Sequence, residues 1–198
     1  MPAIFPPDDF LPGAQLTGKS LQAITRIASW ARWFLLVVST LLFLGAVGLW
    51  IPDEDFMPSL IIFLEITPEQ VDWLHITPLH RLVGFVITLV PALLLIRSMN
   101  HARHMLNSFT RGQVLTLLNA MRLRSIAALI TGFGIAFPLS KTLTAITLTI
   151  NNPPERQIYS FILNLSDMML LGLGVFLWVL SWAMVEAARV VEENNSFV

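Results

Sequence analysis

Two ionisable residues interrupt apolar runs in this chain of 198 residues. Lys141 lies 9 residues before Ile150, and Asp167 lies 9 residues after Ile158. At a rise of ~1.5 Å per residue, each would sit about 13 Å from a shared turn if both runs were antiparallel helices. An ionisable side chain inside an apolar span is costly and usually has a partner. We therefore predict that Lys141 and Asp167 form an ion pair.

The function of this pair has three interpretations. A buried ion pair can fix the register of a helical hairpin, which is the best-supported use of such pairs and the one we prefer. A proton or ion relay is the second interpretation, because intramembrane charges often mark transport paths. In the third, both side chains snorkel and do not pair. Nearby polar contacts are expected from Thr142, Thr144, Thr147, Asn164 and Ser166.

A second group combines carboxylates with imidazoles: Glu65, Glu69, Asp72, His75 and His80. Such side chains at short spacing can bind zinc or another divalent ion. The HExxH pattern and its variants are absent, however, and these residue types are mostly exposed to solvent. We interpret the group as a solvated acidic face and predict no metal site there.

Other sequence features argue against a cofactor or an enzyme. The chain has no cysteine, which removes thiolate-bound metals and thiol catalysis. The four histidines fall in expected loops or at helix ends, whereas a b-type haem needs ligands at bundle depth. No Walker loop, GxSxG elbow or paired catalytic carboxylates are present in the sequence. We expect no cofactor and no enzymatic activity.

A third group is basic and contains no carboxylate between residues 97 and 124. Its members are Arg97, His101, Arg103, His104, Arg111, Arg122 and Arg124. Lysine and arginine beside apolar spans resist translocation, so this segment is expected in the cytoplasm. There it would contact anionic lipid headgroups, with an acidic cytosolic protein as the alternative partner. Nucleic-acid binding is not expected, because no base-reading or stacking face accompanies the charges.

The composition indicates the elements that must position these groups. Hydrophobic residues make up 55% of the chain and charged residues only 13%, about half the usual charged share of a soluble domain. We predict an all-α polytopic membrane protein, a bundle of four transmembrane helices in a single domain over 33–198. The spans are expected at about 33–51, 78–96, 125–150 and 157–185, with an amphipathic N-terminal lead at 1–32, an acidic outer loop at 52–77 and the basic cytoplasmic loop at 97–124.

Local signals refine these boundaries. Thr77-Pro78 predicts a helix start, because threonine caps helices and proline fits the first helical position. Pro91 is expected inside the second helix, which should continue through His104 and break near Arg111-Gly112. The stretch 151–154, with sequence NNPP, predicts a turn before the last span. Tryptophans at 30, 33 and 50 are expected at the membrane interfaces, and glycines at 132, 134, 172 and 174 at close helix contacts.

Two short motifs resemble a known family. Residues 109–116 (FTRGQVLT) followed by 119–126 (NAMRLRSI) are similar to the F-x-x-G-x-x-F/L-T turn and N-x-x-R-L-R-x-I helix of the bacterial four-span family catalogued as domain of unknown function 2975. Residues 171–174, 186–189 and 192–194 resemble the closing helix of that family and its acidic end. The resemblance implies an integral inner-membrane protein without an established activity. Some family members are encoded beside a small helix-turn-helix regulator, which suggests a partner. Lys141 and Asp167 match no family motif.

These observations together predict a multi-pass protein of the bacterial inner membrane with both termini in the cytoplasm. The expected function is that of an accessory or regulatory protein that acts through contacts with a membrane or cytosolic protein. The alternative is a small transporter or channel, formed by a homo-oligomer, that uses Lys141 and Asp167. The two differ in one respect, because a transport path requires the pair to face water whereas a register pair can be dry.

Overall fold

The computed structural model describes residues 18–51, 76–111, 113–159 and 161–196. Its helices are α1 (Gly18–Gly48), α3 (Pro78–Phe109), α4 (Leu117–Thr149), the short 3-10 helix η4 (Pro154–Arg156) and α5 (Leu165–Ser196). The four long helices are each long and apolar enough to cross a membrane. The all-α prediction with four candidate spans is confirmed for the described part of the chain. The start of the N-terminal lead and nearly all of the acidic outer loop lie outside it.

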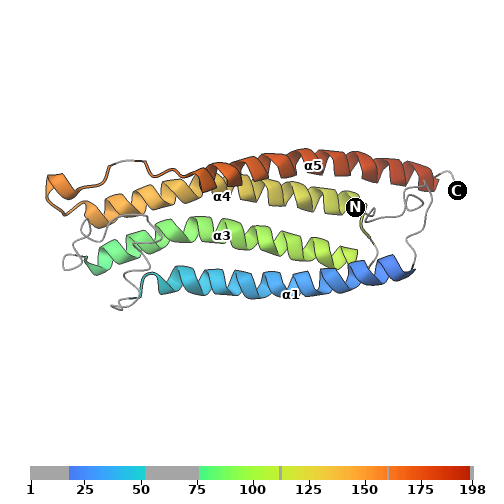
Figure 1. The fold of residues 1–198 in the computed structure, drawn as a ribbon, viewed down its shortest axis with the longest axis horizontal. Coiled ribbons are helices and arrows are strands. Elements are labelled where there is room, and N and C mark those ends of the chain that lie inside the picture. The colour runs from blue at the N-terminus through green and yellow to red at the C-terminus, as the bar shows by residue number, and fades with distance from the viewer. Residues whose placement is uncertain (1–17, 52–75, 112, 160, 197–198) are drawn as a thin grey trace, which may run out of the picture.

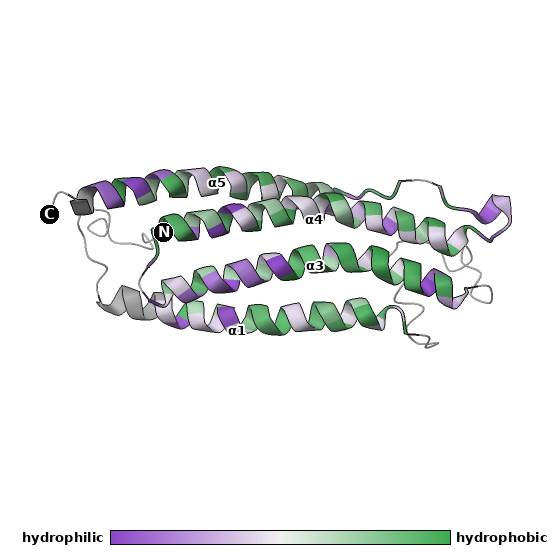
Figure 2. Ribbon diagram, turned by 180° about the vertical axis from the view of Figure 1, so that it is seen from behind, coloured by the Kyte–Doolittle hydropathy of each residue, from purple (hydrophilic) through white to green (hydrophobic). Residues whose placement is uncertain are grey.

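The long helices lie side by side in a sequential order (Figure 1). The helix α1 packs on α3, α3 on α4, and α4 on α5, so α1 and α5 are the outermost helices. The start of α1, the α3–α4 connection and the end of α5 lie at one end of the bundle, which we call the arginine end after Arg103, Arg111, Arg122 and Arg124. The opposite end carries η4 and is called the η4 end. Hydropathy is highest along the middle of the helices and falls towards the arginine end and at η4 (Figure 2).

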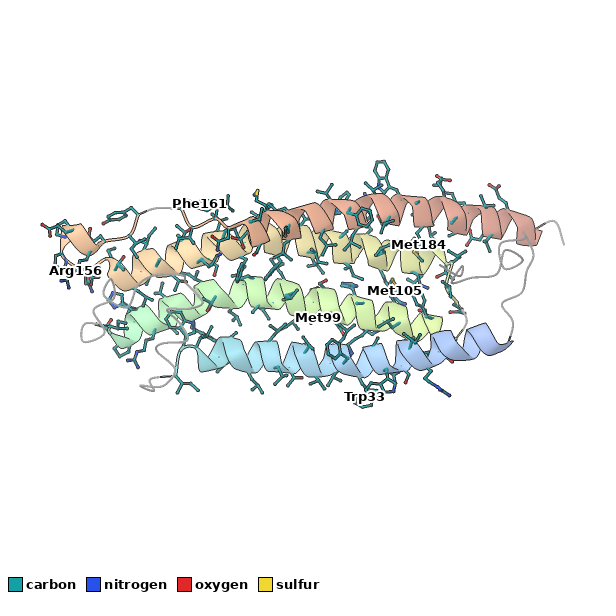
Figure 3. All side chains as sticks on the ribbon, viewed as in Figure 1. Trp33, Met99, Met105, Arg156, Phe161 and Met184 are labelled. Carbon is teal, nitrogen blue, oxygen red and sulfur yellow. The ribbon has the colours of Figure 1, made fainter. Side chains whose placement is uncertain are left out.

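The distribution of polar and apolar side chains is the reverse of that in a water-soluble protein. Large apolar side chains cover the outside, and Trp33 points away from the bundle (Figure 3). In the most apolar stretch of each helix, the share of residues that is buried is 44% in α4, but only 6% in α1 and 11% in α5. The largest fully buried side chains among the described residues are all polar: Lys141, Asn119, Thr144, Thr149, Asp167 and Ser181. Exposed apolar area on this scale is typical of a surface that contacts lipid or another protein.

The helices α3 and α4 begin where their capping residues require. Pro78 is the first residue of α3, and the Thr77 amide donates to His80 Nδ1 at 3.2 Å. Thr116 caps α4, since its hydroxyl accepts from the Asn119 amide at 3.3 Å. These contacts satisfy amides that have no partner inside a helix. The predicted start at Thr77-Pro78 is therefore confirmed.

The second and third helices extend past the predicted spans. The helix α3 contains Pro91 and continues to Phe109, which confirms its predicted passage through His104 and its end before Arg111. The helix α4 is continuous from Leu117, so the amphipathic segment before residue 125 belongs to the same helix as the span. At 33 residues and ~1.5 Å per residue, α4 is about 50 Å long, well beyond the ~30 Å hydrocarbon core of a bilayer.

The predicted start of the fourth span at residue 157 is wrong. The turn at 151–154 is present, with the Asn152 amide donating to the Thr149 carbonyl at 3.0 Å, and η4 follows it. The helix α5 begins only at Leu165, and residues 157–159 and 161–164 return along α4 without regular structure (Figure 1). The apolar content of this return segment resembles that of a span. Its backbone is nevertheless not helical, because the side chains of Thr142, Thr149 and Asp167 bind its amides, as described below.

Candidate functional site

The Lys141–Asp167 pair joins the C-terminal third of α4 to the first turn of α5. Lys141 Nζ lies 3.1 Å from Asp167 Oδ2, and each side chain is only 2% exposed. The ammonium also lies 5.0 Å from the centroid of the Phe137 ring, within range of a cation–π contact. The predicted pairing is thus present. The helical path to Asp167 assumed in that prediction was wrong, however, because residues 157–159 and 161–164 are not helical.

Asp167 has a second function at the start of α5. Its Oδ2 accepts from the Asn164 amide at 3.0 Å, so the carboxylate binds two donors. Asn164 immediately precedes the helix and Asp167 is its third residue, which is the position from which a capping-box carboxylate reaches back. A negative charge there also interacts favourably with the helix dipole. The sequence Asn164-Leu165-Ser166-Asp167 carries this start signal, and our sequence reasoning did not use it.

Two threonines of α4 hold the return segment. Thr142 Oγ1 accepts from the Ile162 amide at 3.0 Å, and Thr149 Oγ1 accepts from the Ile158 amide at 3.1 Å. The same hydroxyls donate to α4 carbonyls four residues earlier. Non-helical backbone at membrane depth is tolerated only where its polar groups are satisfied by protein or water. The two hydroxyls therefore satisfy amides that would otherwise have no partner in an apolar environment.

The other polar residues expected near the pair have different roles. Thr144 is fully buried, and its hydroxyl has no hydrogen-bond partner among the described residues. Thr147 instead donates to the Leu143 carbonyl of its own helix at 2.8 Å. Thr142 and Asn164 contact the return segment and Asp167 as described above. Ser166 lies in the first turn of α5, exposed to the surroundings.

Glycines allow α4 and α5 to pack closely between the Lys141–Asp167 pair and the arginine end. A Cβ on Gly174 would lie 2.9 Å from the Thr131 backbone nitrogen, and one on Gly134 would lie 3.0 Å from the Leu171 side chain. The predicted close contact is confirmed at these two positions. Gly172 differs, because a Cβ there would have no atom within 4 Å. The α4–α5 hairpin is therefore tightly packed on one face and open on the other.

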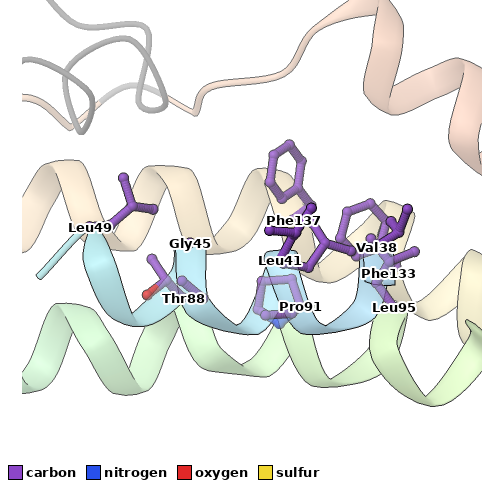
Figure 4. Close-up of a pocket in the computed structure, with 12 residues that line it drawn as sticks. Val38, Leu41, Gly45, Leu49, Thr88, Pro91, Leu95, Phe133 and Phe137 are labelled. Carbon is purple, nitrogen blue, oxygen red and sulfur yellow. The ribbon is translucent and has the colours of Figure 1, made fainter. Parts of the chain in front are cut away.

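The opposite side of the bundle contains an apolar cavity of about 420 Å³ between α1, α3 and α4 (Figure 4). Its one hydroxyl-bearing lining residue is Thr88, whose Oγ1 donates towards the Gly84 carbonyl at 3.0 Å and accepts from Trp50 Nε1 at 2.9 Å. The cavity thus offers a ligand no free polar group and would favour hydrocarbon. Its lining residues are Val38, Leu41, Leu42, Gly45, Ala46, Leu49, Thr88, Pro91, Ala92, Leu95, Phe133 and Phe137.

Trp50 packs against α3, which the sequence reasoning missed. A Cβ on Gly84 would overlap the Trp50 ring, so glycine is required for the ring to lie against the helix. The indole nitrogen donates to Thr88, as described above. Trp50 was predicted at the interface from its place at the end of a span, and the Gly84-x-x-x-Thr88 spacing on α3 was the available signal for this contact.

The arginine end contains two kinds of basic residue. Arg122 joins α4 to α3, because its Nη1 donates to the His104 carbonyl at 2.9 Å and to Ser108 Oγ at 2.6 Å. Arg124 lies over the Trp178 ring of α5, 5.4 Å from its centroid. These two arginines therefore contact neighbouring helices of the bundle, and the contact with lipid headgroups predicted for them stays a prediction. The others vary in exposure: Arg97, His104 and Arg111 are exposed, and His101 and Arg103 are partly buried.

The structure describes only one residue, His80, of the predicted group of carboxylates and histidines. Glu65, Glu69, Asp72 and His75 lie outside the described residues. His80 caps α3 with its Nδ1, and its Nε2 lies 3.2 Å from Asn151 Nδ2 in the turn after α4. The described part of the chain holds no group of three or more residues that could bind a metal ion.

Comparison with known proteins adds no family to these observations. No protein-family model, no curated protein and no solved structure matches the chain. The resemblance to the four-span family of domain of unknown function 2975 stays a prediction, based on the two motifs around the α3–α4 connection and on residues 171–174, 186–189 and 192–194. The part of those motifs that the structure explains is local: Asn119 Nδ2 donates to the Gln113 and Val114 carbonyls at 2.7 and 3.1 Å and so fixes the turn.

Proposed function

We propose that the chain is an integral protein of the bacterial inner membrane that acts as a non-enzymatic accessory or regulatory protein. The observation that carries this proposal is the reversed burial pattern, with polar side chains inside and large apolar side chains outside. In water such a surface would cause aggregation, whereas in a bilayer it contacts lipid chains or the helices of a partner. The resemblance to a bacterial four-span family is consistent with this location.

The proposed partner surface is formed by the two outermost helices. Among the described residues, α1 packs chiefly on α3 and α5 chiefly on α4, and both carry many exposed apolar side chains. Phe34 on α1 is 66% exposed and Phe176 on α5 is 59% exposed. Aromatic side chains often supply much of the binding energy at protein interfaces. A membrane partner could therefore bind along either helix without displacing any contact within the bundle, while a cytosolic partner would bind at the arginine end.

The alternative function, a small oligomeric transporter or channel, requires Lys141 and Asp167 to face water. Each side chain is 2% exposed and they contact each other directly. This burial favours the register role over a transport path.

The proposed orientation places the arginine end and both termini in the cytoplasm, since arginine-rich segments beside spans resist translocation. Because the chain has no cysteine, single cysteines can test this without background labelling. Arg111→Cys and Glu155→Cys change exposed residues at opposite ends of the bundle. An impermeant maleimide should label position 155 in intact cells and position 111 only after permeabilisation. The reverse pattern would contradict the orientation.

The accessory role can be tested by photo-crosslinking in the native membrane. A photoreactive amino acid replaces Phe34 or Phe176, with exposed Ile135 on α4 as the matched control position. Mild solubilisation and mass spectrometry then identify the adducts. We expect one heterologous protein, in near-stoichiometric yield, from the α1 or α5 position and not from the control. Adducts with copies of this chain alone would contradict the accessory role and favour a homo-oligomer.

A further inference from the structure

A groove between α1 and α3 is lined by two arginines, Arg97 and Arg103, that make no hydrogen bond or ion pair with the described residues. It has a volume of about 400 Å³ and lies near the arginine end. Leu93 and Ile96 line the part nearer the middle of α3, whereas Asn100 and Arg103 line the part nearer its end. Arg97 lies between these two parts. The groove is lined by Ser39, Leu93, Ile96, Arg97, Asn100 and Arg103.

No protein group neutralises these two arginines in the described part of the chain. Neither guanidinium makes a hydrogen bond or ion pair there, and Arg103 Nε is buried without a partner. The sequences of α1, α3 and α4 contain no aspartate or glutamate at all. The contrast is with Arg122, which donates to two groups on α3. A buried donor without an acceptor is costly, so an external anion would be bound favourably in this groove.

The position of the groove along α3 restricts the kind of anion. Residues 82–96 carry no charge, and Arg97 is the first ionisable residue after them. The groove therefore lies where the apolar part of α3 ends, and it is apolar on one side and cationic on the other. A ligand that matches it has a negatively charged head joined to a hydrocarbon chain. Guanidinium groups bind phosphate oxygens in a bidentate geometry, which makes a phosphate head a suitable match.

We propose that this groove binds one anionic phospholipid. The lipid phosphate contacts Arg97, Arg103 and the Asn100 amide, and an acyl chain lies along Leu93 and Ile96. Lipid would approach from the bilayer leaflet at the arginine end. The inference rests on membrane insertion but not on a protein partner. Loss of lipid binding and absence of a partner are therefore separate results.

The test compares two double variants with the same loss of charge at the same end of the bundle. Arg97→Gln with Arg103→Gln removes the groove cations. Arg26→Gln with Arg111→Gln removes two exposed arginines that do not line the groove. The full-length protein is reconstituted in vesicles of phosphatidylcholine with a minor fraction of phosphatidylglycerol. Gentle detergent extraction and lipid mass spectrometry then give the phosphatidylglycerol retained per chain and its preference over phosphatidylcholine.

We expect about one retained phosphatidylglycerol per chain in the unmodified protein and in the control variant. In the groove variant the preference for phosphatidylglycerol should fall by roughly 10- to 30-fold, given the contribution of each cation near a membrane surface. Arg97→Lys with Arg103→Lys keeps the charge but loses the bidentate geometry, so it should give an intermediate loss in a folded protein.

Three results would overturn the proposal. Equal loss in the groove and control variants would mean that a diffuse positive potential, not a site, attracts the lipid. Unchanged retention in the groove variant would exclude the two arginines. Displacement of the retained phosphatidylglycerol by millimolar inorganic phosphate would show that the groove takes a free anion and does not need a lipid.

Discussion

The α4–α5 side and the α1–α3 side of the bundle differ in whether their charged groups have partners within the protein. On the α4–α5 side, Lys141 contacts Asp167 at 3.1 Å, and threonine hydroxyls bind the amides of the return segment. On the α1–α3 side, Arg97 and Arg103 face a groove without a protein carboxylate, and an apolar cavity lies between α1 and α4. On the first side, the chain itself supplies partners for both buried charges and for the Ile158 and Ile162 amides, whereas the buried hydroxyls of Ser140 and Thr144 have no partner among the described residues. The second leaves cationic and apolar surface that only lipid or another molecule can satisfy.

The largest effect is expected from removing one member of the buried pair. Lys141→Met or Asp167→Asn leaves an uncompensated buried partner, so each should lower the free energy of unfolding by about 3–5 kcal/mol. Asp167→Asn also weakens the cap on Asn164. Unfolding of the purified protein in mixed micelles with increasing dodecyl sulfate would measure the loss.

The exposed pair on α5 provides the control for that prediction. Arg189 Nη1 lies 3.1 Å from Glu186 Oε1, the same separation as in the buried pair, but the side chains are 63% and 70% exposed. Arg189→Gln should therefore change the free energy of unfolding by no more than about 1 kcal/mol. Equal losses at the buried and exposed pairs would show that burial is not what gives Lys141 and Asp167 their effect.

A smaller loss is expected from enlarging a glycine in the α4–α5 contact. Gly174→Val forces a side chain against the Thr131 backbone, and overpacking of this kind costs about 1–3 kcal/mol. Gly172→Val, two residues away on the open face of α5, meets no atom within 4 Å of its Cβ and should be close to neutral. The same unfolding measurement separates the two variants, and similar values for both would contradict the tight packing of this hairpin.

The α1–α3 side should respond in the opposite direction. Gly45→Leu adds apolar volume to the cavity where nothing lies within 4 Å of a new Cβ. Cavity filling commonly stabilises by about 0.5–2 kcal/mol. Gly172→Leu is the matched control, because it gains the same helix propensity without filling a cavity. Stabilisation should be greater at position 45 when both are measured in short-chain detergent, and an equal gain at both would mean that the cavity contributes nothing.

The smallest effect concerns the hydrogen bond from Trp50, which follows α1, to Thr88 of α3, which lines the cavity. Trp50→Phe keeps an aromatic ring against Gly84 but removes the hydrogen bond to Thr88. Hydrogen bonds within membrane bundles contribute about 0.6 kcal/mol on average, so a loss of that order is expected. Thr88→Val should give a similar loss in the unfolding assay, and the double variant should lose no more than either single one.

The sequence was sufficient for the helices but not for the path between α4 and α5. Composition and apolar runs predicted four spans, because the bilayer sets the length and polarity that a span needs. They failed at residues 157–159 and 161–164, where isoleucine and phenylalanine give the hydropathy of a span although the backbone is not helical. Hydropathy does not detect the hydroxyl–amide contacts of Thr142 and Thr149. The Asn164 and Asp167 cap would have placed the helix start correctly.

The candidate sites were predicted to different extents. Lys141 and Asp167 could be paired from sequence, because a lone charge in an apolar run needs a partner and each is the only charged residue within its predicted span. The division of the basic residues could not be predicted, since Arg122 and Arg103 have the same side chain and lie in the same segment. Only the packing of α4 on α3 directs Arg122 to His104 and Ser108, and leaves Arg103 in the groove.

The measurement that tests the central claim most directly is a double-mutant cycle on Lys141 and Asp167. Lys141→Met, Asp167→Asn and the double variant are compared by the free energy of unfolding in mixed micelles. If the pair is a dry contact that fixes the α4–α5 register, the double variant should lose less than the sum of the single losses, with a coupling energy of about 2–3 kcal/mol. Losses that add to within about 0.5 kcal/mol would contradict the claim, because the two side chains would then act independently.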